Sequence, residues 1–273
     1  MNNLHRELAP ISAAAWIDME TELSRTFIRY LGGRRLVDVP APAGPGFAGA
    51  PTGHLEPIDA PQPGVTAALR GSVPAVEFEV AFTVTRAAVD SIERGAQDAD
   101  WQPAKDAARK LAFAEDKAIF HGFAAARTKG IITIATNPSQ PLPDNPREYP
   151  DAVAHALSTL KLAGVNGPYA LALSADAYAK ASESSDEGYP IFHHLRRIVD
   201  GEIVWVPALD GAVVLTTRGG DYELRVGTDL SVGYSSHDDS DIRLYLRESF
   251  AFLPYTSEAA VHLTSSGATR QNP

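Results

Sequence analysis

Apolar residues recur at helical spacing in two long stretches of the chain, and this pattern predicts two amphipathic helices. The first covers residues 12–31 and opens on a serine that can cap it. The second opens at Asp100 and ends just before Gly122, and its apolar stripe is mostly alanine. These small side chains permit a close approach to a sheet. The same pattern places Glu115 and Asp116 on the solvent side of the second helix.

Other apolar runs are too short for helices and predict strands. A short strand is expected over 36–39, and residues 76–84 alternate between apolar and polar side chains, as in a half-buried strand. Helices and near-continuous apolar strands alternate over 151–217, which is typical of a small α/β unit with a covered sheet. Residues 213–234 then form a buried strand, an Arg-Gly-Gly-Asp turn and two short alternating strands, ahead of a last strand over 242–255. We expect 213–234 to be a junction that ties two parts of the fold together.

The segment between Pro40 and Pro74 follows neither pattern. It holds eight prolines and six glycines, with apolar residues scattered among them. Structureless loops beyond roughly 12–15 residues are uncommon in compact domains unless they are functional. We therefore expect an arm that is irregular by itself and packs on another subunit. Residues 44–49 match the dinucleotide pattern G-x-G-x-x-G, but surrounding prolines and the absence of a following helix argue against that site.

Composition narrows the classes of protein. The chain has 273 residues and a formal net charge of −10. It shows no basic stripe, which argues against nucleic acid as a partner. It has no cysteine, so disulfides, thiol catalysis and cysteine-bound metal are excluded. Neither a signal peptide nor a membrane-spanning run is evident, and we expect a cytoplasmic protein with no membrane partner.

No catalytic or metal-binding pattern stands out. His193 and His194 are neighbours, so on a helix they point about 100° apart and suit a solvated or interface pair better than one ion. Asp238, Asp239 and Asp241 lack the glycine and glutamate of a calcium loop and favour a hydrated turn. A catalytic triad assembled only in space stays open. We expect a protein that is not an enzyme and that needs no cofactor and no metal.

Seven groups of short runs carry a resemblance to a known family. They are Leu8-Ala9-Pro10 with Trp16, GRRLVDV at 33–39, IERG at 92–95, ED at 115–116 with IFHG at 119–122, GPY at 167–169, GYP at 188–190, and RGGD at 218–221 with GTDLSVGY at 227–234. In this order and over residues 4–263, the chain resembles the family 1 encapsulin nanocompartment shell proteins, once grouped as linocin-type bacteriocins.

The resemblance implies an α+β chain with the fold of the tailed-phage major capsid proteins, as in the Hong Kong 97 phage. It divides the chain into an N-terminal helical arm with a first strand (1–39), an extended loop (40–75), a peripheral domain (76–131 and 218–263), an axial domain (132–217) and a flexible tail (264–273).

The function implied is that of a structural subunit. Many copies self-assemble into an icosahedral nanocompartment around a cargo enzyme, which docks through a terminal targeting peptide. The cargo is a dye-decolourising peroxidase, which we favour, or a ferritin-like protein. Some relatives bind flavin against an aromatic residue in the helix equivalent to 85–94, but this helix has none, so flavin is not expected.

Two sites follow from the resemblance. The cargo peptide is expected to bind on the inner wall of the shell, at Phe27, Leu31, Arg34, Leu36, Asp38, Leu230 and Tyr234. The apolar residues among these are equally compatible with a role in the core. The pore loop is expected where axial domains meet at the five-fold axis, at Glu183, Asp186, Glu187, Gly188 and Tyr189. A ring of its carboxylates would favour small cations over anions. A secreted bacteriocin or protease-like protein and a phage major capsid subunit are the alternatives.

Overall fold

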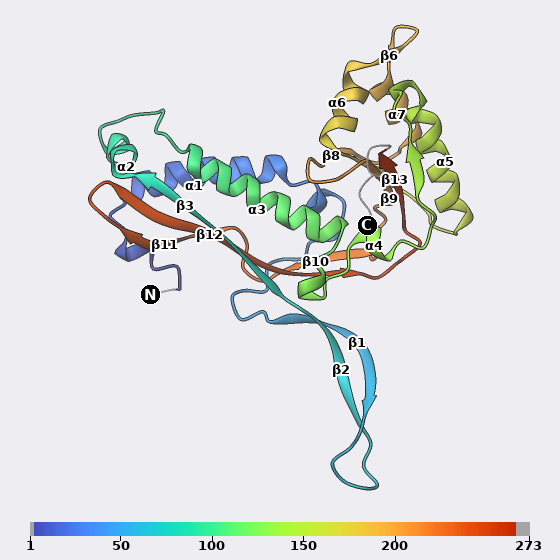
Figure 1. The fold of residues 1–273 in the computed structure, drawn as a ribbon, viewed down its shortest axis with the longest axis horizontal. Coiled ribbons are helices and arrows are strands. Elements are labelled where there is room, and N and C mark those ends of the chain that lie inside the picture. The colour runs from blue at the N-terminus through green and yellow to red at the C-terminus, as the bar shows by residue number, and fades with distance from the viewer. Residues whose placement is uncertain (1–2, 266–273) are drawn as a thin grey trace, which may run out of the picture.

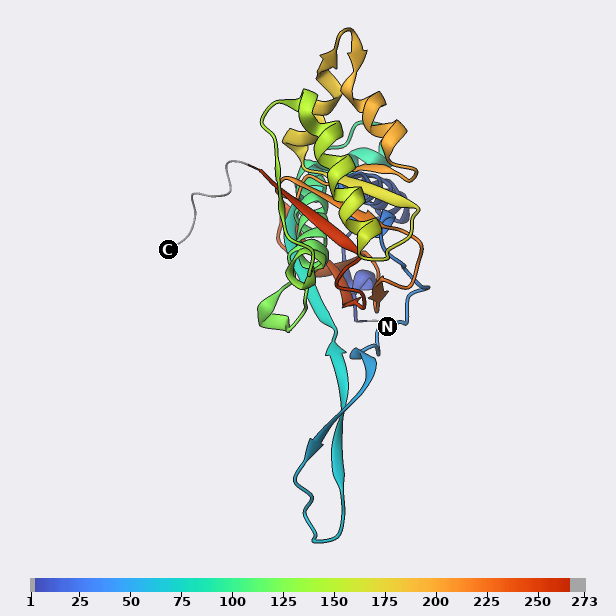
Figure 2. The ribbon, with the colours of Figure 1, turned by 90° about the vertical axis from the view of Figure 1, so that its right-hand side faces the viewer.

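The computed structural model describes residues 3–265, in which an elongated part and an α/β part lie side by side and a long arm projects from the first (Figure 1). Seen from the side, the molecule is narrow, with the arm at one end and a small hairpin at the other (Figure 2). Within the described residues, no helix is both long enough and apolar enough to span a membrane.

The elongated part is a sheet built on one long strand and covered by helices. Its strands are β3 (Val76–Thr85), β10 (Tyr222–Val226), β11 (Ser231–His237) and β12 (Asp241–Pro254). β12 pairs with β3 on one edge and with β11 and β10 on the other, all antiparallel. The helices are α1 (Ala13–Tyr30), α2 (Arg86–Glu93) and α3 (Gln102–Phe120), of which α1 and α3 run side by side over the sheet (Figure 1).

The local signals in the sequence explain where these helices begin and which faces they bury. Ser12 caps α1, because its hydroxyl accepts from the Ala15 amide at 3.2 Å. The predicted apolar face of α1 is confirmed as core, since Met19, Leu23 and Phe27 are all buried. α3 begins two residues later than expected, because the Asp100 carboxylate accepts from the Gln102 amide ahead of the first turn.

The α/β part is a five-stranded sheet with helices packed against it, as the alternating pattern predicted. Its strand order is β4-β13-β9-β5-β8, and every residue of β5 and β9 is buried. The strands are β4 (Gln140–Leu142), β5 (Tyr169–Leu173), β8 (Ile203–Trp205), β9 (Ala212–Thr216) and β13 (Ala260–Ser265). The helices are α4 (Ile131–Ile134), α5 (Tyr149–Leu162), α6 (Ala175–Glu183) and α7 (Ile191–Ile198).

The last described strand corrects one expected boundary. Residues 218–263 were expected to belong to the peripheral domain, which corresponds to the elongated part. In the structure, β13 pairs with β9 and β4 in the α/β sheet. Ala260, Val261 and Leu263 of β13 are buried, and the strand lies between β9 and β4 in that sheet. β13 also includes residues 264 and 265, the first two of the expected tail, and the rest of that tail lies outside the described residues. Short 3₁₀ helices occur at Arg6–Leu8, Gly33–Arg35, Ala124–Ala126 and Pro146–Glu148.

The arm is a two-stranded antiparallel ribbon, so the expectation of an irregular segment was wrong. β1 (Gly49–Ile58) pairs with β2 (Ala67–Pro74), with a register shift between Pro51 and Leu55 (Figure 1). Prolines obscured the strand pattern. They are tolerated because each strand of an isolated ribbon has one free edge, where a missing N–H breaks no ladder hydrogen bond.

The predicted junction at 213–234 joins the two sheets, as expected. β9 ends in the α/β sheet, residues 217–221 form a turn, and β10 begins in the sheet of the elongated part. Gly219 and Gly220 both take positive φ in this turn, which favours glycine. Asp38 fixes the turn, because its carboxylate accepts from the Gly220 amide at 2.6 Å. The expected strand over 36–39 is reduced to a single bridge between Asp38 and Glu223.

Candidate functional site

An apolar pocket opens where the end of α1 meets the loop between β10 and β11. Its volume is about 350 Å³. Its lining is Ser24, Phe27, Ile28, Leu31, Arg34, Arg35, Asp229 and Leu230. Four of the seven residues expected to bind the cargo peptide therefore lie together: Phe27, Leu31, Arg34 and Leu230. This lining is called the α1 groove below.

The other three expected residues lie elsewhere. Leu36 is buried in the core that joins the two parts, and Asp38 holds the junction turn. Tyr234 packs at the edge of the elongated part's core, and its hydroxyl forms a hydrogen bond with Nδ1 of His237 at 2.6 Å. None of the three lines the α1 groove, and their part in peptide binding stays a prediction.

The sequence reasoning missed Ile28, the most exposed apolar side chain of the α1 groove. It is 70% exposed, one position beyond the buried stripe that contains Phe27. A large apolar residue off the buried face of an amphipathic helix was the available signal. Ile17 gives the same signal earlier on α1, at 67% exposure, but does not line the groove.

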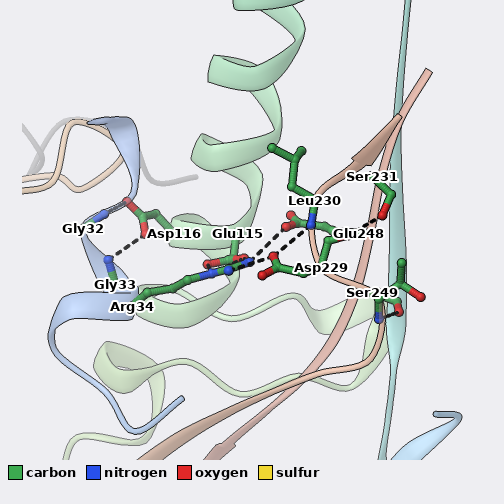
Figure 3. A network of polar contacts seen from close by, with 11 residues as sticks. Gly32, Gly33, Arg34, Glu115, Asp116, Asp229, Leu230, Ser231, Glu248 and Ser249 are labelled. Carbon is green, nitrogen blue, oxygen red and sulfur yellow. Dashed lines mark hydrogen bonds and ion pairs between the residues drawn. The ribbon is translucent and has the colours of Figure 1, made fainter. Parts of the chain in front are cut away.

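Arg34 closes one end of the α1 groove and is held by three carboxylates (Figure 3). Its Nε and Nη2 donate to Glu115 at 2.8 and 2.6 Å, and its Nη1 donates to Asp229 at 2.8 Å. Nη2 also reaches Glu248 at 3.4 Å. The guanidinium carbon lies 5.3 Å from the centre of the Phe27 ring. These contacts fix the side chain, so the groove has a preformed polar end.

The burial of Glu115 and Asp116 contradicts the expectation that they face solvent. Both side chains are fully buried. The Asp116 carboxylate accepts hydrogen bonds from the amides of Gly32 and Gly33 at 2.9 and 2.8 Å. The Glu115 carboxylate accepts hydrogen bonds from the Arg34 guanidinium (Figure 3). The end of α3 is thus covered on a second side by the loop that follows α1. The helical period of α3 could not reveal this cover, because the covering loop belongs to another segment.

Burial controls the electrostatics of this cluster. It raises the pKa of Asp116 to about 7, although the two backbone hydrogen bonds act against the rise. Burial, and then the charge of Glu115, also raise the pKa of Glu248 well above its ordinary value. A proton on Glu248 would let this carboxyl donate, which matters because its Oε1 finds no partner among the described residues. For Arg34, burial opposes the charge, but Glu115 and Asp229 outweigh it and raise the guanidinium pKa.

The second expected site forms a hairpin at the far tip of the α/β part (Figure 1). It consists of β6 (Ser185–Asp186) and β7 (Tyr189–Pro190), with Glu187 and Gly188 at positive φ in the turn. The five expected pore residues lie in or beside this hairpin. The carboxylates of Glu183, Asp186 and Glu187 are exposed.

Tyr189 anchors the base of this hairpin. Its ring packs edge-on against His194 at 4.6 Å between ring centres, and the Arg197 guanidinium lies 5.2 Å from it. His193 also contacts the ring, so the two histidines support the hairpin.

Within residues 3–265, no group of three or more histidine or carboxylate side chains is arranged to hold a metal ion. The carboxylate of Asp238 caps its own turn by accepting from the Ser240 and Asp241 amides.

Comparisons with known proteins agree with this geometry. Residues 1–251 match the family model described as "Encapsulating protein for peroxidase". A curated relative, the type 1 encapsulin shell protein of Rhodococcus erythropolis, is 56% identical over 96% of this chain and 100% of its own length. Among solved structures, the virus-like particle from Pyrococcus furiosus matches with a TM-score of 0.65 at 16% identity, covering 91% of this chain and 98% of that one. The capsid of Myoviridae phage XM1 matches with a TM-score of 0.51 at 12% identity, covering 86% of this chain and 90% of that one. The expected α+β capsid fold is confirmed.

Proposed function

This chain belongs to the encapsulin shell protein family, and from that premise we propose how its surfaces serve a closed compartment. It is a structural subunit whose copies self-assemble into an icosahedral shell that encloses a cargo enzyme. The family description names a peroxidase, which supports a dye-decolourising peroxidase as the cargo ahead of a ferritin-like protein.

The α1 groove is the proposed docking site for the cargo's terminal peptide. The observation that supports it is the apolar wall formed by the exposed Ile28 and the half-buried Leu230, next to the fixed guanidinium of Arg34. An extended peptide could bury apolar side chains against this wall without moving the shell subunit. The groove provides shape and a fixed charge, and the proposed role of the subunit is binding without catalysis.

Substitution Ile28→Asp tests this site. Burying one isoleucine is worth roughly 1.5–3 kcal/mol, so its loss should lower cargo affinity about ten- to hundredfold. The variant and the peroxidase with its terminal peptide would be co-expressed, and cargo per shell measured by native mass and activity. Leu36 and Arg34 are poor test positions, because both support the fold.

Ile17→Asp is the matched control, since Ile17 has almost the same exposure on the same helix. It should load cargo normally. Equal loading in both variants would refute the groove as the docking site. Negative-stain images of the same preparations test the shell itself, and a chain that stays monomeric or dimeric would contradict the shell function separately.

The segment 183–190, from the end of α6 through the β6–β7 hairpin, is the proposed pore loop. Its exposed carboxylates and its place at the tip of the α/β part support this role. A cytoplasmic location for the compartment is proposed as well, on the basis of the sequence expectation. The phage capsid alternative rests on a shared fold at 12% identity, and the bacteriocin or protease-like alternative has no supporting site.

A further inference from the structure

A polar cleft separates α1 from α3 and is distinct from the α1 groove. Its volume is about 530 Å³. Four cationic side chains line it, two from each helix: Arg25 and Arg29 from α1, and Lys105 and Arg109 from α3. We call it the basic cleft. Such a concentration of positive charge is unexpected on a chain whose formal net charge is −10.

The neighbouring carboxylates do not neutralise this cleft. Glu22 is shared by Arg25 at 2.6 Å and Lys105 at 3.3 Å. Asp106 is shared by Arg109 at 3.5 Å and by the side-chain amide of Gln102. Two carboxylates therefore face four cations.

Arg29 is the group that most clearly lacks a partner. Within residues 3–265, its guanidinium takes part in no ion pair and in no hydrogen bond. The Arg109 pair is about half exposed on both sides, and such pairs contribute little energy, so Arg109 can exchange its partner for a ligand. Guanidinium groups bind phosphate through paired N–H donors.

We propose that the basic cleft binds a small anion that carries a chain of phosphate groups. Three guanidinium groups and one ammonium group line a single polar space, and Tyr30 and Thr26 also line it. A triphosphate carries several negative charges along one short chain, which matches cations presented by both helices. Inorganic polyphosphate and the phosphate chain of a nucleotide share this chemistry.

Calorimetric titration of assembled shells tests the proposal. Tripolyphosphate, ATP and adenosine would be titrated at low ionic strength, where exposed charges are least screened. Tripolyphosphate should bind with up to one site per chain, and adenosine should not bind. ATP binding as tightly as tripolyphosphate identifies the phosphate chain as the recognised group, and tighter ATP binding identifies a nucleotide.

Paired variants supply the specificity test. Arg29→Gln/Arg109→Gln should weaken tripolyphosphate at least about tenfold. Arg94→Gln/Arg127→Gln is the matched control, because both arginines are exposed outside the cleft. It removes the same two charges and should bind as the unchanged chain does. Equal weakening by the control would show non-specific attraction and overturn the proposal.

Two further results would also overturn it. If assembled shells bind no tripolyphosphate, the cleft is not a phosphate site in the shell. A hexaglutamate peptide that binds more tightly than tripolyphosphate, and loses this binding with Arg29→Gln/Arg109→Gln, would assign the cleft to an acidic protein segment.

Discussion

At the scale of single residues, the end of α3 concentrates buried charge beside the proposed cargo groove. Glu115 and Asp116 are adjacent in sequence but serve different segments: one holds Arg34, and the other holds the backbone of the loop after α1. The polar end of the groove and the path of the chain are therefore set by the same two carboxylates. A change at either one should affect the stability of the subunit as well as its surface.

Asp116→Asn should destabilise the subunit in a pH-dependent way. An asparagine amide nitrogen cannot accept a hydrogen bond, so one of the Gly32 and Gly33 amides loses its acceptor, at a cost of about 1–3 kcal/mol. The folded-state pKa of Asp116, about 7, lies above its ordinary 3.8. The stability that protonation contributes is therefore complete below 3.8 and is lost as pH rises through about 7. The deficit of the variant should be largest near pH 5 and smaller at pH 8.

Chemical unfolding followed by tryptophan fluorescence between pH 5 and 8 measures this difference. Burial lowers the pKa values of His121 and His262, but both proteins contain them, so their contribution cancels in the comparison. Asp106→Asn, an exposed position on the same helix, should change the free energy of unfolding by no more than about 0.5 kcal/mol. A deficit that stays constant across this range would show that Asp116 does not titrate there.

The positions of residues that depend on the period of one helix could be predicted from the sequence. The positions of residues that depend on contacts between distant segments could not. Phe27 and Leu31 follow from the apolar period of α1, and the family resemblance added Arg34 and Leu230. Glu115 has no local sign of burial, because its partner Arg34 is 81 positions away. A buried ion pair depends on which segments meet in space, and a single sequence does not state that.

At the scale of elements, the arm exposes apolar side chains on both of its faces. Leu55 lies opposite Arg70 and Leu69 lies opposite Glu56, so the two leucines point to opposite faces of the ribbon. They are 66% and 55% exposed. A ribbon that is apolar on both sides suits an arm enclosed between neighbouring subunits, in line with the expectation that this segment packs on another copy.

Leu69→Asp should prevent assembly without unfolding the subunit. The arm projects away from both cores (Figure 2), so the free energy of unfolding should change by no more than about 0.5 kcal/mol. A charge buried in a subunit contact is strongly unfavourable. The yield of particles in size-exclusion chromatography should fall at least about tenfold. A loss of about 1.4 kcal/mol of binding free energy at one subunit contact already weakens that contact tenfold.

Gln62→Asp, at an exposed polar position in the turn of the same arm, is the control and should assemble normally. Normal particles from Leu69→Asp would remove the arm from the assembly contacts. The sequence indicated an unusual segment here but not its ribbon structure. The pairing of residues 49–58 with 67–74 depends on cross-strand contacts. The prolines interrupt the alternating pattern that would have indicated two strands.

At the scale of the whole molecule, the proposed pore loop and the arm occupy opposite ends (Figures 1 and 2). If five or more tips meet around an axis, each contributes three exposed carboxylates to one opening. Arg147 offsets little of this charge, because it lies 4.0 Å from Asp186 and both side chains are more than half exposed.

Reversing these charges should slow the entry of small cations. The variant changes three residues to lysine: Glu183, Asp186 and Glu187. Uptake of a divalent cation by shells that contain a fluorescent chelator should slow by about tenfold or more, because a charged opening changes local ion concentration by this order. The matched control places the same three charges on exposed positions around α2, at Asp90, Glu93 and Asp98. Uptake that is equal in the two variants would show that cations enter elsewhere.

The length of β12 has a mechanical consequence. Ten of its residues pair in unbroken register with β3, from Asp241 with Thr85 to Phe250 with Val76. A pull along this direction would strain all of these hydrogen bonds in shear at the same time, whereas a pull across it would open them one after another. The elongated part should therefore resist extension most strongly along the direction of β12 and β3.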